Sequence, residues 1–344
     1  MPDAIATEAL RKVYPAPPGR RRSSASGRTN GPTSAVSGTP SSSRTTSEGI
    51  IALDGLDLTV RSGELFGLLG PNGAGKTTTI GILTTRVLAS SGRALVAGHD
   101  VATAAVRVRQ RIGVVPQRPN PDRSLTTLEN LVFHAAYFGF AFDRATRSAG
   151  ELLERLGISD KADAKVDALS GGQQQRLMIA RALIHEPEVI FLDEPTVGLD
   201  PQARLDLWGI LRELHAQGRT IVMTTHYMEE ADQLCERVAI VDRGLLLACD
   251  TPQRLKASAP GGTLVEVTLD GSADGVVAAV RQLPGISRAE AHGDVLHVYR
   301  ERGGESIPAL IGVAQSAARA VTNIHLTTPS LESLFISMTG RKLD

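Results

Sequence analysis

The stretch ELFGLLGPNGAGKTTT at residues 64–79 joins an apolar run to a glycine-rich loop. The run at 64–69 predicts a strand buried on both faces, as in a parallel sheet. The loop GPNGAGKT at 70–77 fits the phosphate-loop pattern, because its glycines let successive backbone N–H groups face a phosphate. A helix predicted over 76–88 begins at the end of this loop and adds positive potential there. These features predict an α/β fold built around a nucleotide-binding loop.

Apolar runs and helical segments alternate along most of the chain. Strands are expected at residues 50–53, 56–60, 93–96, 189–192 and 220–223, and helices over 126–158, 170–183 and 203–216. Such alternation is typical of a parallel α/β sheet. The strand at 189–192 ends in Asp193 and Glu194, which places two carboxylates at one end of that strand. A solvated strand end is the alternative interpretation of this pair.

The bulk composition limits the class of protein. The 344 residues include 37 basic and 37 acidic side chains, so the net charge is zero and no globally basic surface for nucleic acid is indicated. Only two cysteines are present, Cys235 and Cys249, and they favour a reducing compartment. The N-terminus has no apolar core of signal-peptide type, and no apolar run approaches the roughly 18 residues of a membrane span.

The composition also changes along the chain. Residues 16–48 consist almost entirely of Pro, Gly, Ser, Thr and Arg, so they predict a disordered insertion; a basic tether to anionic lipid or nucleic acid is the alternative. Residues 261–344 show strand and helix periodicities in the order β-α-β-(β)-α-β, which predicts a small α+β domain of split-βαβ type. The expected organisation is a main domain formed by residues 1–15 and 49–260, with residues 261–344 as an accessory domain.

The pentapeptide LSGGQ at residues 169–173 lies between the phosphate loop and Asp193-Glu194. Ser170 is placed to cap the helix that follows, and the start of a helix favours an anion. A simple cap in a glycine-rich turn is the alternative interpretation. The phosphate loop, LSGGQ and Asp-Glu in this order resemble the ATP-binding subunit of an ATP-binding-cassette (ABC) transporter. The resemblance covers roughly residues 5–14 and 50–255.

This resemblance implies the fold, the cofactors and a set of site residues. The implied fold is a phosphate-loop NTPase cassette, with a RecA-like core, an antiparallel β subdomain and a helical subdomain, and the implied cofactors are ATP and Mg²⁺. Nucleotide binding is implied for Tyr14, Gly70, Pro71, Asn72, Gly73, Ala74, Gly75, Lys76, Thr77, Thr78, Ser170, Gly171, Gly172, Gln173 and Asp200. Catalysis is implied for Glu194, His226 and Gln117, and Mg²⁺ coordination for Thr77, Gln117 and Asp193.

The resemblance also implies the role of each catalytic residue. Glu194 is expected to polarise the attacking water, a role whose loss typically costs about 10²–10⁴-fold in rate. Gln117 is expected to sense Mg²⁺ or that water and to relay the state of the site to a membrane partner. His226, in TTH at 224–226, resembles the switch histidine that contacts the γ-phosphate; a structural histidine is the alternative.

Tyr14 and the aromatic residues after Gln117 each have two interpretations, and two other residues are implied to act across a subunit boundary. Tyr14 resembles the aromatic residue that stacks on adenine, although residues 16–48 intervene where the family has a short gap; a surface tyrosine is the alternative. Ser170 and Asp200 are implied to contact the opposite subunit of a dimer. The aromatic side chains spaced along the helix after Gln117 form either a core stripe or the wall of a groove for a membrane partner. These aromatic residues are Phe133, Tyr137 and Phe140.

The resemblance implies an assembly as well. Two cassettes close head to tail over two ATP molecules, so the chain is expected to form a homodimer or to pair with a second cassette subunit. A separate polytopic permease would hold it at the cytoplasmic face of the membrane, and no nucleic acid partner is expected. Segments at 195–201, 225–232 and 329–335 are similar to drug-resistance (daunorubicin-resistance-like) and ABC-2-type exporters. Export of a drug, lipid or polysaccharide is therefore expected. An importer ATPase and a soluble ABC ATPase acting on ribosomes or DNA are the alternatives.

Overall fold

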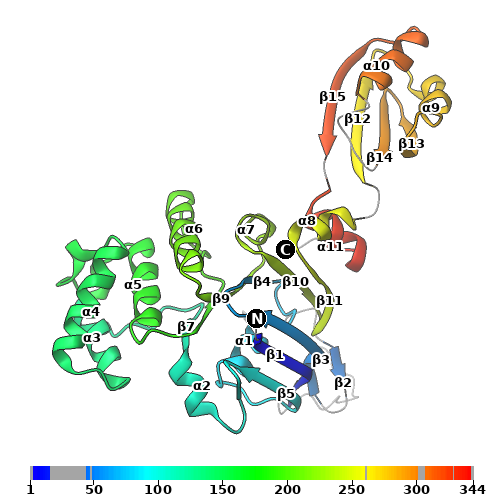
Figure 1. The fold of residues 1–344 in the computed structure, drawn as a ribbon. Coiled ribbons are helices and arrows are strands. Elements are labelled where there is room, and N and C mark those ends of the chain that lie inside the picture. The colour runs from blue at the N-terminus through cyan, green and yellow to red at the C-terminus, as the bar shows by residue number, and fades with distance from the viewer. Residues whose placement is uncertain are drawn as a thin grey trace, which may run out of the picture. The chain divides into compact units, whose positions relative to one another are not determined.

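The computed structural model describes residues 3–15, 44–46, 49–259, 262–300, 307–327 and 329–341. The described residues form two compact units, which divide between Cys249 and Asp250 (Figure 1). The expected disorder of residues 16–48 lies outside the described residues, except that Arg44–Thr46 forms the short strand β2. No helix in the described part of the chain is both long enough and apolar enough to cross a membrane.

A six-stranded sheet forms the centre of the first unit, with the strand order β11-β10-β4-β9-β8-β7. Its strands are β4 (Leu65–Leu69), β7 (Ile112–Val115), β8 (Val189–Asp193), β9 (Thr220–Thr225), β10 (Arg237–Asp242) and β11 (Leu245–Asp250). Neighbouring strands from β10 to β7 run parallel. Every residue of β4, β8 and β9 is buried, as the continuous apolar runs predict. The predicted strands at 189–192 and 220–223 are therefore confirmed.

A second sheet of the first unit is antiparallel, with the order β2-β3-β1-β5-β6. Its other strands are β1 (Asp3–Tyr14), β3 (Gly49–Arg61), β5 (Ser91–Val96) and β6 (His99–Asp100). The two short strands expected at 50–53 and 56–60 are one strand, β3, so that prediction was wrong. Gly55 has φ +81° and the β1–β3 ladder shifts register, so the chain passes this point without leaving the sheet.

The helices of the first unit include the four predicted helical stretches, two of which differ in extent, and two helices that were not predicted, at residues 105–111 and 228–234. They are α1 (Lys76–Leu83), α2 (Ala105–Arg111), α3 (Thr127–Tyr137), α4 (Phe142–Arg155), α5 (Gly171–Leu183), α6 (Pro201–Ala216) and α7 (Met228–Leu234), with 3₁₀ turns at Ser159–Lys161 and Val166–Ala168. The first helix ends at Leu83 instead of Leu88, because Thr85 adopts φ 62°. The helical stretch 126–158 divides at Gly139, which adopts φ +87°.

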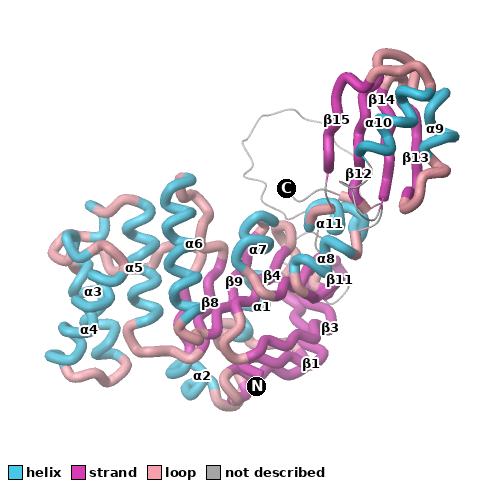
Figure 2. The backbone as a smooth tube through the Cα atoms, turned by 45° about the horizontal axis from the view of Figure 1, so that its top comes forward, coloured by secondary structure: helices cyan, strands magenta, loops and turns pink. Residues whose placement is uncertain are grey.

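These helices form a group in which α3 and α4 lie side by side and α5 packs between them and α6 (Figure 2). Thr126 begins α3 with a capping box: its side chain accepts from the N–H of Glu129, and the Glu129 carboxylate accepts from the N–H of Thr126. Two local side chains therefore determine where α3, the first helix of this group, begins.

The second unit contains a four-stranded antiparallel sheet with the order β13-β14-β12-β15. Its elements are α8 (Pro252–Ala257), β12 (Thr263–Leu269), α9 (Asp274–Val280), β13 (Ile286–His292), β14 (Val295–Arg300), α10 (Ile307–Ser316), β15 (Val321–Thr327) and α11 (Leu331–Thr339). Alternate residues of the strands pack with α9 and α10 in one core, which is the split-βαβ arrangement expected from the sequence. The division at Cys249/Asp250 precedes the predicted boundary at 260/261, since α8 packs against α11 within this unit.

We expect Gly113→Ala to destabilise the first unit. A Cβ atom at Gly113 in β7 would lie 2.2 Å from the carbonyl oxygen of Ala182 in α5, so strand and helix would be forced apart. Overpacking of this kind typically lowers the free energy of unfolding by about 1–3 kcal/mol. Gly150→Ala in α4 is the control, because nothing lies within 4 Å of the added atom. It should stabilise by about 1 kcal/mol. Urea denaturation measures both, and equal midpoints would contradict the packing argument.

Candidate functional site

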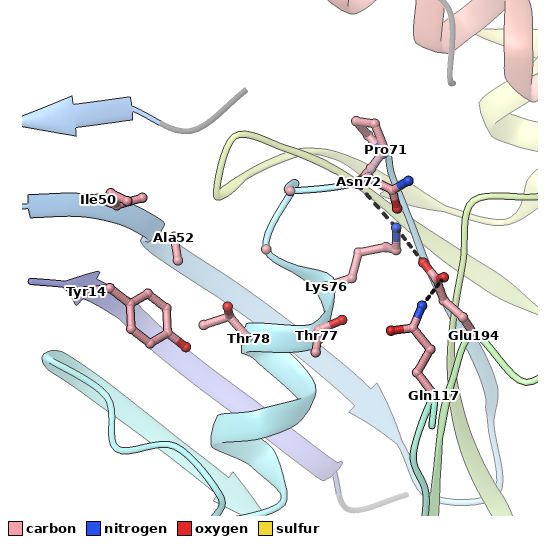
Figure 3. A pocket seen from close by; sticks show the side chains of 12 residues that line it. Tyr14, Ile50, Ala52, Pro71, Asn72, Lys76, Thr77, Thr78, Gln117 and Glu194 are labelled. Atoms are coloured by element: carbon pink, nitrogen blue, oxygen red, sulfur yellow. Dashed lines mark hydrogen bonds and ion pairs between the residues drawn. The ribbon is translucent and has the colours of Figure 1, made fainter. Parts of the chain in front are cut away.

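The candidate site is a pocket of about 260 Å³ where β4 ends and α1 begins (Figure 3). Its walls bring together residues from β1, β3, the phosphate loop, the loop after β7 and the end of β8. They are Tyr14, Ile50, Ala52, Pro71, Asn72, Gly73, Gly75, Lys76, Thr77, Thr78, Gln117 and Glu194. Most of the residues predicted for one half of a nucleotide site therefore lie around one cavity.

The phosphate loop has a conformation that only glycine adopts without strain. Gly75 precedes α1 with φ 108°, and a Cβ atom there would lie 2.7 Å from the carbonyl oxygen of Ala52 and from a methyl group of Leu53. Gly73 also has a positive φ, 81°. No side chain caps the start of α1, so its first backbone N–H groups are available to an external anion. This loop fits a bound phosphate group.

Lys76 is the cationic centre of the pocket. Its Nζ donates to the carbonyl oxygens of Gly70 (2.6 Å) and Pro71 (3.2 Å) and lies 3.1 Å from Oε1 of Glu194. The side chain is only 4% exposed, and burial lowers the pKa of the Lys76 ammonium below its ordinary value, against the opposing effect of Glu194 and Asp193. An ammonium held this far from water attracts an anion strongly.

Glu194 is held from several directions. Its backbone has φ 50°, unusual for a residue other than glycine, and its N–H donates to Oγ1 of Thr224 at 2.9 Å. Nε2 of Gln117 donates to Oε2 of Glu194 at 2.9 Å, while Lys76 occupies Oε1. Nδ1 of His226 lies 3.4 Å from the same Oε1, without the geometry of a hydrogen bond. Two of the predicted catalytic residues, Gln117 and His226, therefore converge on the carboxylate of the third, Glu194.

Thr77 and Asp193 form the part of the site that suits a metal ion. Oγ1 of Thr77 donates to Oδ1 of Asp193 at 3.4 Å, and Oγ1 of Thr224 donates to the same oxygen at 2.7 Å. The described residues contain no cluster of three or more His, Cys, Asp or Glu side chains able to hold a metal by themselves. A hydroxyl and one carboxylate fit Mg²⁺, which usually takes its other ligands from water and phosphate oxygens.

The LSGGQ segment and the segment around Asp200, which were both predicted to bind nucleotide, lie outside this pocket. Ser170 is the N-cap of α5, where its Oγ accepts from the N–H of Gln173 (3.3 Å) and the Gln173 side chain accepts from the N–H of Ser170 (2.9 Å). Asp200 is the N-cap of α6, and its Oδ1 accepts from the N–H of Ala203 at 2.9 Å. Neither segment contributes a residue to the pocket walls. The capping role predicted for Ser170 is confirmed.

Sequence comparison with known proteins identifies the family of this chain. Residues 53–197 match the family model described as ABC transporter. The chain is 35% identical over 294 residues to the linearmycin resistance ATP-binding protein LnrL of Bacillus subtilis (strain 168), an alignment that covers 84% of this chain and 94% of the relative. It is 40% identical over 294 residues to the Nod factor export ATP-binding protein I of Rhizobium sp. (strain N33), covering 86% and 94%. The chain belongs to the ABC transporter ATP-binding proteins.

Solved structures agree with this membership. The cbiO1 protein of Clostridium perfringens, part of an ABC transporter complex, superposes with a TM-score of 0.60 at 26% identity, covering 74% of this chain and 91% of that one. The ATP-binding cassette MJ0796, solved as a dimer with ADP and Pi, gives 0.59 at 25% identity, covering 72% and 98%. The chain is therefore an ATPase with the ABC cassette fold, as the sequence motifs predict.

The end of the pocket around Tyr14 contains residues that sequence reasoning missed. Tyr14 lies at the end of β1 with Ile50 opposite it in the β1–β3 register, and Ile50 and Ala52 continue the wall beside it (Figure 3). Nζ of Lys12 lies 4.9 Å from the centroid of the Tyr14 ring and donates to the carbonyl oxygen of Leu88. An apolar wall beside a half-exposed aromatic ring suits a flat base. Only the strand pairing reveals this wall, because no motif contains these residues.

The aromatic residues predicted to line one face of the helical group differ in their exposure and contacts. Phe133 and Tyr137 on α3 are 52% and 84% exposed, so the interpretation of a core stripe was wrong for them. Phe140 lies beneath the guanidinium of Arg144, whose Cζ is 4.2 Å from the ring centroid. The cassette thus presents two large apolar side chains to its surroundings on one helix.

We expect Glu194→Gln to separate nucleotide binding from turnover. Loss of the carboxylate should lower ATP turnover by about 10²–10⁴-fold. ATP affinity should rise by about tenfold, since a neutral amide no longer competes with phosphate oxygens for Lys76. Phosphate release and isothermal titration with ATP measure the two quantities.

Glu64→Gln is the matched control for this variant. Glu64 is also buried and paired with a cation, Arg237, but it lies outside the pocket. This substitution should leave turnover and ATP affinity unchanged. If Glu194→Gln binds ATP no more tightly than the unaltered chain, competition for Lys76 is not how Glu194 acts.

Proposed function

We propose that this ATPase hydrolyses ATP between two cassettes and thereby powers export through a separate membrane permease at the cytoplasmic face of the membrane. One observation carries the proposal. The pocket contains the phosphate loop, Lys76, Gln117 and Glu194, whereas Ser170 and Asp200 lie at helix starts outside its walls. The residues of one chain therefore supply half of a composite site, and a second cassette supplies the other half.

Each residue of the pocket has a distinct role in the proposed reaction. When bound, ATP supplies the terminal phosphate bond that is cleaved. The N–H groups at the start of α1 and the ammonium of Lys76 hold the phosphate oxygens. Release of Lys76 to these oxygens leaves Oε1 of Glu194 able to accept a proton from a water molecule. Gln117 orients the carboxylate through its hydrogen bond to Oε2.

Mg²⁺ would be held by Oγ1 of Thr77 and the carboxylate of Asp193. Thr224 donates to Oδ1 of Asp193 and therefore fixes that carboxylate from the neighbouring strand β9. Mg²⁺ would supply charge neutralisation at the phosphate oxygens. Gln117 borders a second cavity together with Thr77 and Asp193, which supports the proposal that it senses the region of the metal.

The start of α5 supports a role in dimer formation. Ser170 and Gly171 are exposed, and α5 is a 13-residue helix whose N-terminus favours a negative charge. Its capping box holds the backbone in a fixed conformation without covering it from a partner. The similar cassette MJ0796 was solved as a dimer, which supports pairing of two cassettes. We infer that Ser170, Gly171, Gly172 and Gln173 bind the γ-phosphate of ATP held by the opposite cassette.

Export is supported by the relatives and by one surface. The similar proteins are named for linearmycin resistance and for Nod factor export, and both names describe removal of a compound from the cell or resistance to it. We propose a cargo of the drug, lipid or polysaccharide class. The exposed Phe133 and Tyr137 on α3 suit a short apolar segment of the permease.

We expect Ser170→Ala to weaken ATP-dependent dimerisation. In a Glu194→Gln background, the unaltered loop should give an ATP-dependent dimer in light scattering after gel filtration. Loss of the Ser170 hydroxyl removes a hydrogen bond to a charged phosphate, so the dimer dissociation constant should rise by about tenfold or more. Thr126→Ala is the control, because it removes an equivalent capping box on α3. Equal weakening by both substitutions would show that only helix stability matters.

We expect a polytopic membrane protein to co-purify with tagged Glu194→Gln protein. The preparation uses native cells, ATP and mild detergent, and the expected yield of the partner is stoichiometric. Tyr137→Glu in the same bait should reduce this yield, whereas Met338→Ser, which alters an exposed apolar residue of the second unit, should not. Recovery of ribosomal or DNA-associated proteins instead would favour the soluble-ATPase alternative and contradict the proposed export function.

A further inference from the structure

Within the part of the chain that the structure describes, no hydrogen bond holds Nδ1 of the His226 ring. This atom is buried and lies 3.4 Å from Oε1 of Glu194. The backbone around it is held: Oγ1 of Thr225 accepts from the N–H of Tyr227 (2.9 Å) and donates to Oε2 of Glu230 (2.7 Å). The position of the main chain is thus determined, and the orientation of the ring depends on packing.

Tyr227 provides that packing. The rings of His226 and Tyr227 lie 4.1 Å apart at an angle of 43°. On the tyrosine ring lies the guanidinium of Arg204, with its Cζ 5.1 Å from the centroid, within the range of a cation–π interaction. Nε of Arg204 is buried and has no hydrogen bond in the described part of the chain. The Tyr227 ring is therefore a close neighbour of this guanidinium.

Arg204 joins this contact to the start of α6. Its N–H donates to the carbonyl oxygen of Asp200 at 3.0 Å, and Asp200 is the N-cap of the helix. A contiguous series of contacts thus runs from Asp200 through Arg204 and Tyr227 to His226 beside Glu194. Because reacting groups must be placed to within a fraction of an ångström, a small rotation of the histidine ring is enough to slow a reaction.

We propose that Arg204 and Tyr227 are positioning residues, which orient His226 against Glu194 from the first turn of α6. The inference rests on the proposed role of His226 in ATP hydrolysis. Neither residue lines the nucleotide pocket, so both act through the histidine ring. The arrangement makes turnover, and not ATP binding, sensitive to the position of the Asp200 segment.

The test compares two arginines of α6 that make the same kind of contact. Arg212 lies over the ring of Trp208, with its Cζ 5.9 Å from the centroid, and is two turns away from Arg204. We expect Arg204→Met to lower kcat by about three- to tenfold, a range set by the strength of a cation–π contact. KM for ATP and the dissociation constant for ATP should stay unchanged, and any fall in Tm should be no larger than that of Arg212→Met, which removes a contact of the same kind. Arg212→Met should leave kcat unaltered.

Conservative variants distinguish positioning from simple stability. Arg204→Lys retains a cation over the ring and should recover part of the lost kcat. Tyr227→Phe keeps the aromatic face and should stay near the unaltered rate, whereas Tyr227→Leu should match Arg204→Met. A loss of kcat that parallels a fall in Tm, or that is equal for Arg204→Met and Arg212→Met, would overturn the proposal.

His226→Ala separates this inference from the proposed function. If His226→Ala retains full turnover, the role assigned to the histidine fails and the positioning role fails with it. If His226→Ala abolishes turnover while Arg204→Met and Tyr227→Leu have no effect, only the positioning role is overturned. Reduced turnover in all three variants, with ATP affinity unchanged in Arg204→Met and Tyr227→Leu, is the result that the structure predicts.

Discussion

The buried ion pair between Lys76 and Glu194 organises the candidate site. Two charges so far from water are stable only when they satisfy each other and their remaining hydrogen bonds. The carbonyl oxygens of Gly70 and Pro71 take up the other protons of the ammonium, and Gln117 donates to the second carboxylate oxygen. The pair joins the loop after β4 to the end of β8, although β9 lies between these strands in the sheet.

This ion pair links anion binding to the chemistry of the carboxylate. A phosphate group that enters the loop competes with Glu194 for the buried ammonium of Lys76. Binding of the phosphate therefore releases the carboxylate of Glu194. Thr224 on β9 limits how far the carboxylates can move, because its hydroxyl donates to Asp193 and accepts from the N–H of Glu194. The site therefore combines an exchangeable ion pair with a rigid backbone.

The first turns of α1, α5 and α6 differ in whether a side chain caps their backbone N–H groups. The first N–H groups of α1 have no side-chain cap and open onto the pocket, whereas α5 and α6 are capped by Ser170 and Asp200. An uncapped start leaves its donors to a ligand, and a capped start holds a loop in place. The start of α1 thus offers its N–H groups to a phosphate in the pocket of the same chain, whereas the capped starts of α5 and α6 present fixed surfaces to the opposite cassette of the proposed dimer. Arg204 links the start of α6 to the ring beside His226.

The phosphate loop, the buried strands and the N-cap at Ser170 followed from the sequence because their physical causes are local. Glycines at 73 and 75 permit the loop, continuous apolar runs require a sheet covered on both faces, and Ser170 with Gln173 is a self-contained cap. The end of α1 at Leu83 and the continuity of β3 did not follow, because they depend on the conformations of Thr85 and Gly55. Tertiary structure alone decided that Glu194 pairs with Lys76, that Ile50 faces Tyr14 and that Arg204 covers Tyr227. Each of these contacts joins segments far apart in the chain, and the packing of sheets and helices determines such distances.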